Sequence, residues 1–494
     1  MMNRNFVIVC VWLSASSCQA LASTLTVTDP GDAGSGVCGT TCTLRDAIAS
    51  ASPGGGDTIM FAPGLASPIT LSQGALILNK ALTVQGPGAA KLTVSANNAS
   101  QVLIVSAQAS ISGLTLADGF ITGTAGSNGA DGTSGASGVP GGPGGPGSPG
   151  GLAGGACVQV ANTGVLVLDH VAVRHCRAYG GSGGNGGAGG MGNLNFMAPP
   201  LSAGGAGGNG SAGGDATGGA ILVYGSLSLL NSSVVDGQTY GGAGGAGAAG
   251  GIGESGGNFV HGASGVSGAG GAANGGAVFV AAGSLHISNS TIAGGSGTGG
   301  TGGAGVTTGT QDVTYGGAGG AASGGLIRMD ASATLADLEF STLTGGQVVG
   351  GSGGSGVTGH MGPPGTSSGN AISAASTTTV LSSVIVDLQS GVSLCDGQAA
   401  ADAGSVNLSE DASCTGFTLQ GTFAQLFHPL DVTTMPWPGY LPLYHSAVID
   451  AAATCLDLTP KTVSMDQHDT PRPQGAQCDL GAIEADYIFV DSFE

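Results

Sequence analysis

The chain has 494 residues, of which 101 are Gly, and only 8% are charged. The formal net charge is -20, and so acidic a chain lacks the basic surface that nucleic acids and anionic membranes require. With 41% apolar residues and few charges, the composition also differs from that of disordered chains, so we expect a folded protein that uses glycine in an unusual way.

Residues 1–22 are typical of a secretory signal peptide. The apolar run Phe6–Leu13 precedes a small-x-small cleavage site at Ala20–Ala22. This run is too short to span a bilayer, and no later stretch is long and apolar enough to predict a transmembrane helix. Cys18 leaves a lipoprotein signal as an alternative, although Ala15 stands where such signals usually carry Leu. We therefore predict an exported protein.

Eight cysteines follow the predicted signal peptide, an even number in a chain bound for an oxidising compartment. They form four pairs of sequence neighbours, and we predict disulfides within these pairs: Cys38–Cys42, Cys157–Cys176, Cys395–Cys414 and Cys455–Cys478. Metal binding is the alternative, with His170 and His175 close to Cys176. Because no Cys-x2-Cys pair occurs, we predict neither a metal site nor a cofactor.

Residues 43–51 predict a short amphipathic helix, with Leu44, Ala47 and Ile48 on one face. The segment C-T-L-R-D-A-I at 42–48, followed by G-D-T-I-M-F at 56–61, resembles the C-S-L-R-E-A-I segment of bacterial exported β-helix proteins. Thr replaces Ser and Asp replaces Glu. The resemblance implies export and fold, and it supplies no catalytic residues. We place an N-terminal cap at 23–56.

A repeat begins alike at residues 155, 219, 276, 325 and 370. Within it, apolar residues alternate with Ser, Thr or His, as Ser226–Val235 and Ser284–Ile292 illustrate, and this alternation is typical of half-buried strands. Such short units cannot cover their own apolar face, but stacked units can. The sequence therefore predicts an all-β protein, a right-handed parallel β-helix over 57–391.

Five Gly-rich insertions enter the repeat at one position, so we expect them to project from one side: 119–154, 180–218, 237–275, 293–324 and 345–369. Glycine stands at every third position from 123 to 150. Three is the period of the polyproline II helix, and these glycines leave one of its faces bare. We predict a bundle of such helices.

A disordered brush is the main alternative to this bundle, and a collagen-like assembly of three chains is another. Ordering one insertion of 30 residues costs about 30–60 kcal/mol. Ten hydrogen bonds between helices return only about 5–15 kcal/mol. The sequence alone therefore leaves these alternatives open.

Residues that could carry chemistry are sparse. Asp169 with Arg174, and Asp330 and Glu339 with Arg328, come nearest to the carboxylate and base of a polysaccharide lyase. They belong to different coils, and solvated charges at strand edges are the alternative. We assign no catalytic residue. Asn231, Asn289 and Glu339 occupy matching places in their repeats and predict a polar column at a turn.

The turns of the insertions are better candidates, because aromatic residues are rare in this chain and several lie there. Exposed aromatic side chains on rigid supports suit recognition of sugars or proteins, whereas packing of the tips against one another is the alternative. The predicted binding residues are Phe196, Met197, Phe259, His261 and Tyr315.

Residues 392–494 form the predicted disulfide-bearing C-terminal region. Asp466–Pro473 and Cys478–Glu484 resemble the end of the choice-of-anchor Q domain, which implies a β-helix that precedes a sorting tail. Ile488–Glu494 resembles the I-F-x-x-G-F-E ending of exported Gram-negative proteins, with Ser492 in place of Gly. These resemblances imply an extracellular or outer-membrane surface location.

We therefore predict a secreted or cell-surface, adhesin-like binding protein whose insertions meet a cell-surface glycan or protein. A polysaccharide-active lyase or hydrolase is the second hypothesis. A structural or ice-binding surface protein is the third, since flat Gly-rich bundles can order water, although the chain lacks regular Thr-x-Thr ladders.

Overall fold

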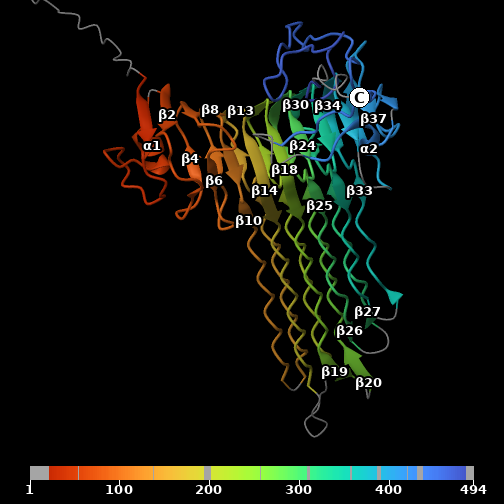
Figure 1. The fold of residues 1–494 in the computed structure, drawn as a ribbon. Coiled ribbons are helices and arrows are strands. Elements are labelled where there is room, and N and C mark those ends of the chain that lie inside the picture. The colour runs from red at the N-terminus through yellow and green to blue at the C-terminus, as the bar shows by residue number, and fades with distance from the viewer. Residues whose placement is uncertain are drawn as a thin grey trace, which may run out of the picture.

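The structure is a computed structural model that describes residues 22–53, 55–136, 138–193, 202–255, 258–308, 312–356, 359–386, 391–419, 421–430 and 438–485. Residues 1–21 of the predicted signal peptide and the predicted sorting tail lie outside the described residues. Figure 1 shows a solenoid of short strands in the upper part of the view, with a bundle of long arms below it.

The scaffold is a parallel β-helix, as the repeats predict. In its first sheet, strands at matching positions of successive coils pair in parallel, for example β13 (Val165–Asp169) with β17 (Ser226–Leu230) and β17 with β23 (Gly283–Ser288). The other strands of this sheet are β1 (Thr24–Val27), β2 (Asp57–Phe61), β4 (Leu76–Leu78), β5 (Leu82–Gln85), β7 (Leu103–Val105), β8 (Gln108–Ser112), β12 (Val158–Val160), β16 (Ile221–Val223), β22 (Val278–Val280), β29 (Ile327–Met329), β30 (Ala333–Glu339), β34 (Ile372–Leu381) and β36 (Cys395–Ala401).

Two further sheets complete the coils. The second contains β3 (Ile69–Thr70), β6 (Thr93–Ser95), β9 (Thr115–Ala117), β10 (Phe120–Thr122), β14 (Ala172–Tyr179), β18 (Ser233–Tyr240), β24 (Thr291–Ala293), β25 (Ser296–Thr298), β31 (Thr342–Thr344), β32 (Gln347–Val349), β35 (Val384–Val386), β37 (Leu408–Ser409) and β38 (Thr418–Leu419). The third contains β11 (Ala153–Gly154), β15 (Ala216–Thr217), β21 (Ala273–Asn274), β28 (Ala322–Ser323) and β33 (Ser367–Ser368).

Apolar side chains of matching coils stack into a continuous core. Leu166, Leu227 and Leu285 occupy matching positions in β13, β17 and β23, and none is more than 1% exposed. Their neighbours Ser226 and Ser228 in β17 are half-buried on the other face of the strand. Each coil thus covers the apolar face of the next, which is how a repeat that cannot bury its own core becomes stable.

A serine ladder, formed by Ser232, Ser290, Ser341 and Ser383, lies where the first sheet turns into the second. The hydroxyl of Ser290 accepts the backbone N–H of Ser232 at 3.1 Å, and the hydroxyl of Ser341 accepts that of Ser290 at 3.3 Å. The N–H of Ser383 ends the ladder at Oδ1 of Asn407, at 2.8 Å. These side chains give buried backbone donors the partners that they need.

The residue before each rung of the ladder has a left-handed backbone. Asn231 and Asn289 take φ values of 48° and 46°, which asparagine tolerates well. The predicted polar column is wrong in its third member, because Glu339 pairs with Ser288, and Phe340, with φ 43°, stands beside Asn289. An aromatic residue fits there because Phe340 lies in a buried apolar cluster with the C-terminal region.

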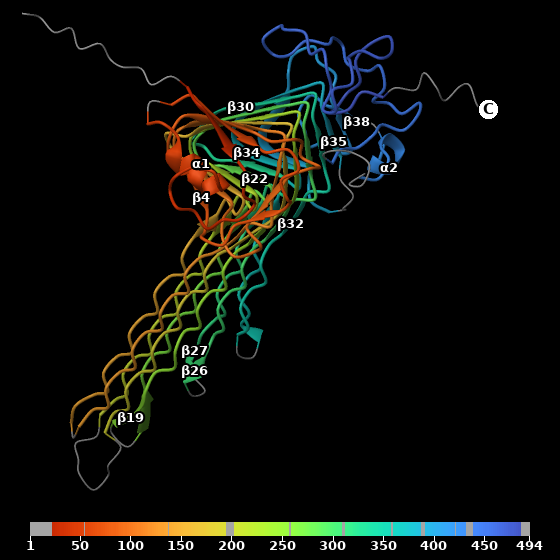
Figure 2. The ribbon, with the colours of Figure 1, turned by 60° about the vertical axis from the view of Figure 1, so that its left-hand side comes forward.

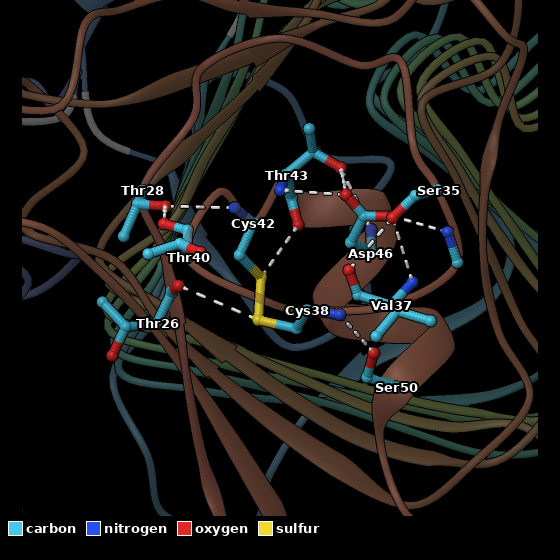
Figure 3. The surroundings of a disulfide bond; sticks show 11 residues. Thr26, Thr28, Ser35, Val37, Cys38, Thr40, Cys42, Thr43, Asp46 and Ser50 are labelled. Carbon is cyan, nitrogen blue, oxygen red and sulfur yellow. Dashed lines mark hydrogen bonds between the residues drawn. A yellow bond between two sulfur atoms is a disulfide. The ribbon is translucent and has the colours of Figure 1, made fainter.

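The N-terminal cap contains α1 (Leu44–Ser50), whose Leu44, Ala47 and Ile48 are buried as predicted. Thr43 and Asp46 form a capping box, in which the Thr43 hydroxyl accepts the N–H of Asp46 at 3.1 Å. Burial alone would raise the pKa of Asp46, but hydrogen bonds from Thr43 and from backbone N–H groups outweigh it and lower that pKa. Figure 3 shows this network beside a disulfide.

The disulfides of the structure match the predicted local pairs: Cys38–Cys42, Cys157–Cys176, Cys395–Cys414 and Cys455–Cys478. In Figure 3 the Cys38–Cys42 bond ties the segment before α1 to the start of that helix, and the Cys38 N–H donates to Ser50 Oγ at 2.8 Å. Cys157 and Cys176 are fully buried and link the start of β12 to β14 across one coil.

The C-terminal region, residues 438–485, lies against the corner of several coils. The Asn289 amide donates to the carbonyl of Met465 at 3.1 Å, and the N–H of Ala482 donates to Thr342 Oγ1 at 3.0 Å. Its buried Arg472 pairs with Glu484 at 3.0 Å. A short helix, α2 (Phe423–Leu426), precedes it and contributes to the same apolar cluster.

Candidate functional site

The arms leave the β-helix on one side, as the common position of the insertions predicts (Figures 1 and 2). An outgoing arm continues a strand of the second sheet, so that Gly180 follows β14, and a returning arm leads into the third sheet. The outgoing arms are 123–135, 180–192, 241–251, 299–306 and 350–356, and the returning arms are 141–151, 202–214, 262–271, 314–320 and 360–365. We call them together the arm bundle.

The outgoing arms form one layer of the bundle and the returning arms form the other. Within a layer, Gly186 donates its N–H to the carbonyl of Ala246 at 2.9 Å, and between the layers Gly187 donates to the carbonyl of Gly145 at 2.9 Å. The bonds recur every three residues and join different arms, as in packed polyproline II helices. In each Gly-Gly-x triplet, therefore, the first glycine bonds within the layer and the second bonds across it.

Glycine is needed because the arms touch backbone to backbone. A Cβ atom on Gly187 would lie 2.0 Å from the carbonyl oxygen of Ala130, and one on Gly208 would lie 1.9 Å from that of Gly145. No side chain fits at these distances. The described arms therefore form the predicted bundle and not a brush.

The third residue of each triplet faces outwards, where its N–H has no neighbouring carbonyl. Asn128 Oδ1 accepts the N–H of Asn185 at 2.9 Å, and Asn185 Oδ1 accepts that of Ala246 at 2.8 Å. Asp131 does the same for Ala188 at 2.8 Å. These side chains stabilise the outer face of the outgoing layer by satisfying backbone donors.

The outer face of the returning layer is made mostly of small apolar side chains. Asn209 interrupts it, with its Oδ1 accepting the N–H of Val266 at 3.0 Å. The exposed members of this face are Pro143, Pro146, Pro149, Ala206, Ala212, Ala263, Val266 and Ala269. Residues three apart along one polyproline II helix are about 9.3 Å apart, so these side chains form a regular two-dimensional array.

The far end of the bundle exposes larger side chains. The hairpin of β19 (Ile252–Ser255) and β20 (Asn258–His261) ends the third pair of arms, and there Phe259 is 67% exposed and His261 is also exposed. A second hairpin, β26 (Thr307–Thr308) with β27 (Asp312–Val313), ends the fourth pair. Figure 2 shows the ends of the longer arms lying farther from the scaffold than those of the shorter arms.

Tyr315, just beyond β27, is 64% exposed and its ring meets that of His360 edge to face, with the centroids 4.7 Å apart. Met361 is 65% exposed beside it. Phe259 and Tyr315 therefore sit on different steps of the bundle end. The other predicted binding residues, Phe196 and Met197, lie outside the described residues.

An aromatic stack, which the sequence analysis missed, stands at the base of the outgoing layer. The rings of Tyr179 and Tyr240 are stacked with centroids 4.5 Å apart, and Phe120 lies 5.5 Å from Tyr179 on the other side. Alignment of the residue that precedes each insertion's first glycine would have brought the two tyrosines together. The stack helps to set the register in which the arms leave the scaffold.

The charged residues considered for catalysis do not gather into one site in the described structure. Arg328 donates from Nη1 to Ser373 Oγ at 2.6 Å. Glu339 is buried, its Oε1 accepts the N–H of Leu458 in the C-terminal region at 3.0 Å, and burial raises its pKa. A carboxylate covered in this way cannot face a polymer in a groove.

Asp169 has its own partners. It contacts His170 Nδ1 at 2.7 Å and accepts a hydrogen bond from Asn231 at 3.0 Å. His170 Nε2 also meets Asp469 of the C-terminal region at 3.0 Å, and the hydrogen bond with Asp169 raises the pKa of His170. The cluster thus fastens the C-terminal region to the coil of β13. His175 lies apart from it, between Asp118 at 3.5 Å and Asp236 at 3.7 Å.

No family model and no curated protein matches the sequence. Among solved structures, the fold resembles that of pectate lyase Pel9A, with 14% identity, a TM-score of 0.30, and coverage of 94% of this chain and 97% of that chain. A rhamnogalacturonan lyase matches with 9% identity, a TM-score of 0.25, and coverage of 81% and 85%.

A springtail antifreeze protein from Granisotoma rainieri, a nine polyproline type II helical bundle whose crystal waters match the ice lattice, also matches. The identity is 25%, the TM-score is 0.10, and the match covers 40% of this chain and 93% of that chain. These likenesses concern architecture, and at these scores none of them transfers an activity to this chain.

Proposed function

We propose that this protein is an exported, surface-associated binding protein that presents the distal end of its arm bundle to a glycan or protein ligand. The observation that carries the proposal is the exposure of Phe259, Tyr315 and Met361 at the end of a densely hydrogen-bonded support. Such side chains are costly to leave in water, and they bind well when a rigid scaffold has already paid the entropy of ordering them.

Export is inferred from the sequence together with the disulfides. Four disulfides are typical of proteins that fold outside the cytosol. The signal-like residues 1–22 and the resemblance of 42–48 to the C-S-L-R-E-A-I segment favour a bacterial exported protein, and residues 466–473 favour surface anchoring. In the described part of the chain, neither helix has the length and apolar character needed to cross a bilayer.

The test measures binding of the mature chain to a printed glycan array and to a panel of immobilised cell-surface proteins. We expect the double variant Phe259→Ser, Tyr315→Ser to lose a binding signal that the unaltered chain shows, because both side chains lie at the bundle end. Tyr224→Ser, an equally large change at an exposed scaffold position, is the control and should keep the signal. Equal binding by all three proteins would refute the proposal.

A second candidate function, ice binding, is favoured by one observation, the regular array of small side chains on the returning layer. Such an array can order water at a fixed spacing. The test is a thermal hysteresis assay on the mature chain and on Ala206→Lys, Ala263→Lys, which breaks the array without touching the arm contacts. Hysteresis that the double variant abolishes would replace the display proposal, whereas no hysteresis would exclude ice binding.

A further inference from the structure

A pocket in the C-terminal region, away from the arms, has no part in the proposed function. It has a volume of about 320 Å³, and its lining includes Tyr444, His445, Ile449, Asp450 and Asp479. The Tyr444 and His445 rings lie together, with their centroids 3.7 Å apart. Aromatic rings and carboxylates therefore face one enclosed space of a size suited to a small molecule.

The acidic groups of this pocket are held in place by backbone donors. Asp479 is 2% exposed, and its two oxygens accept the N–H groups of Asp450 at 2.8 Å and of Ala485 at 2.7 Å. Asp450 Oδ1 accepts the N–H of Gln477 at 2.8 Å. The neighbouring Arg472 gives its salt bridge to Glu484, so its charge is already compensated. Two carboxylates thus face the pocket without an ion pair of their own.

The backbone around the pocket is strained. His445 and Asp450 take φ values of 59° and 53°, a region that residues other than glycine adopt at a cost. Both line the pocket. Burial also raises the pKa of Asp479 to about 6, which shows that its negative charge lacks a compensating cation in the empty pocket. Strain and an uncompensated buried charge coincide at binding sites more often than elsewhere.

We propose that this pocket binds a small organic cation, an alkylammonium group, between the Tyr444 and His445 rings and the Asp450 carboxylate. The described residues that line the pocket include no Lys or Arg, so its charge is complementary to a cation. Aromatic rings attract ammonium groups through their negative faces, and the apolar lining at Ile449 accommodates the alkyl chain. The group can belong to a free amine or to a lysine side chain of another protein.

The experiment is a calorimetric titration of the mature chain with n-butylammonium, choline and N-acetyl-lysine amide at millimolar concentrations. The first two probes represent free amines and the third represents a protein lysine, so their relative affinities distinguish the two sources. Glucose and galacturonate are titrated in parallel. Binding of a sugar alone, or binding of none of the ammonium probes, overturns the proposal.

Asp450→Asn is the decisive variant. Asparagine keeps the acceptor for the Gln477 N–H and tolerates the left-handed backbone, so the fold should survive while the charge is lost. We expect ammonium binding to weaken roughly tenfold or more. Asp131→Asn is the matched control, since Asp131 also accepts a backbone N–H but lies in an arm. Equal affinity in both variants contradicts the proposal.

The pH dependence gives a second readout. Binding should weaken as the pH falls through about 6, because Asp479 then becomes protonated and neutral. The ionisable groups that face Asp479 are Asp450, Glu484 and Arg472, and His445 lies on the same pocket. Asp479→Asn should remove most of this dependence, and a profile unchanged in that variant shows that another group controls binding.

Discussion

At the residue scale, the serine ladder shows how a small polar side chain can hold two coils together. Ser290 is 1% exposed, and its hydroxyl accepts the N–H of Ser232 from the preceding coil. Ser290→Ala leaves that buried donor unpaired, so we expect the free energy of unfolding to fall by about 1–3 kcal/mol. Urea denaturation measures this loss. Ser288→Ala, a half-buried position in β23 outside the ladder, should cost less than about 0.5 kcal/mol.

A single methyl group tests the backbone contacts of the arm bundle. Gly187→Ala would place a Cβ atom 2.0 Å from the carbonyl oxygen of Ala130, so the arms must separate. We expect a loss of about 1–3 kcal/mol or more, seen as faster amide hydrogen exchange across the neighbouring arms. The control Ala188→Ser changes the next residue, which is exposed, and should leave exchange unchanged. Similar exchange in both variants would mean that the arms do not pack as described.

The sequence indicated some of these residues and not others, for a physical reason. Phe259 and Tyr315 could be singled out because an aromatic residue inside a Gly-rich segment has few structural uses. The stacking of Tyr179 on Tyr240 depends on which strand pairs with which, and a single repeat does not show that register. Phe340 was missed because its place beside Asn289 depends on the C-terminal region that covers it.

At the element scale, the disulfides constrain loops of different lengths, which predicts an order of stabilities. Cys157 and Cys176 are 19 residues apart, and Cys38 and Cys42 are 4 apart. Because the entropy of a closed loop grows with its length, replacing the first pair by serines should cost about 3 kcal/mol and replacing the second about 2 kcal/mol. Denaturation of the two double variants measures the difference, and the reverse order would contradict this account.

The arms and the strands were predictable to different degrees for the same reason. A period of three or of two can be read along the chain, and each period dictates which face of an element is bare or apolar. The partition of the arms into two layers could not be read, because it depends on where a distant arm lies. Two adjacent glycines in each triplet carry that information only once the layers are known.

At the scale of the whole molecule, the C-terminal region makes stability depend on pH. Burial raises the pKa of Asp479 from 3.8 to about 6, so between these values the folded protein holds more protons than the unfolded chain. The free energy of unfolding should therefore fall by about 2–3 kcal/mol as the pH rises from about 4 to above 6. Burial of Glu339 raises its pKa and acts in the same direction.

Urea denaturation at about pH 5 and about pH 8 measures this change, and Asp479→Asn should make the two midpoints converge. The Asp169 contact raises the pKa of His170, which adds stability below its ordinary value of 6.5 that is lost as the pH rises through the raised one. Greater stability at the alkaline pH would contradict the assigned signs.

The division of labour within each Gly-Gly-x triplet has a consequence for how such a protein can diverge. Adding or removing one whole triplet on both limbs of a hairpin changes its reach by about 9.3 Å and leaves every remaining contact in phase, whereas a single-residue insertion would force side chains into the seams. Reach is thus adjustable in quanta, independently of the solenoid, and the shorter fourth and fifth hairpins look like different settings of one ruler (Figure 2).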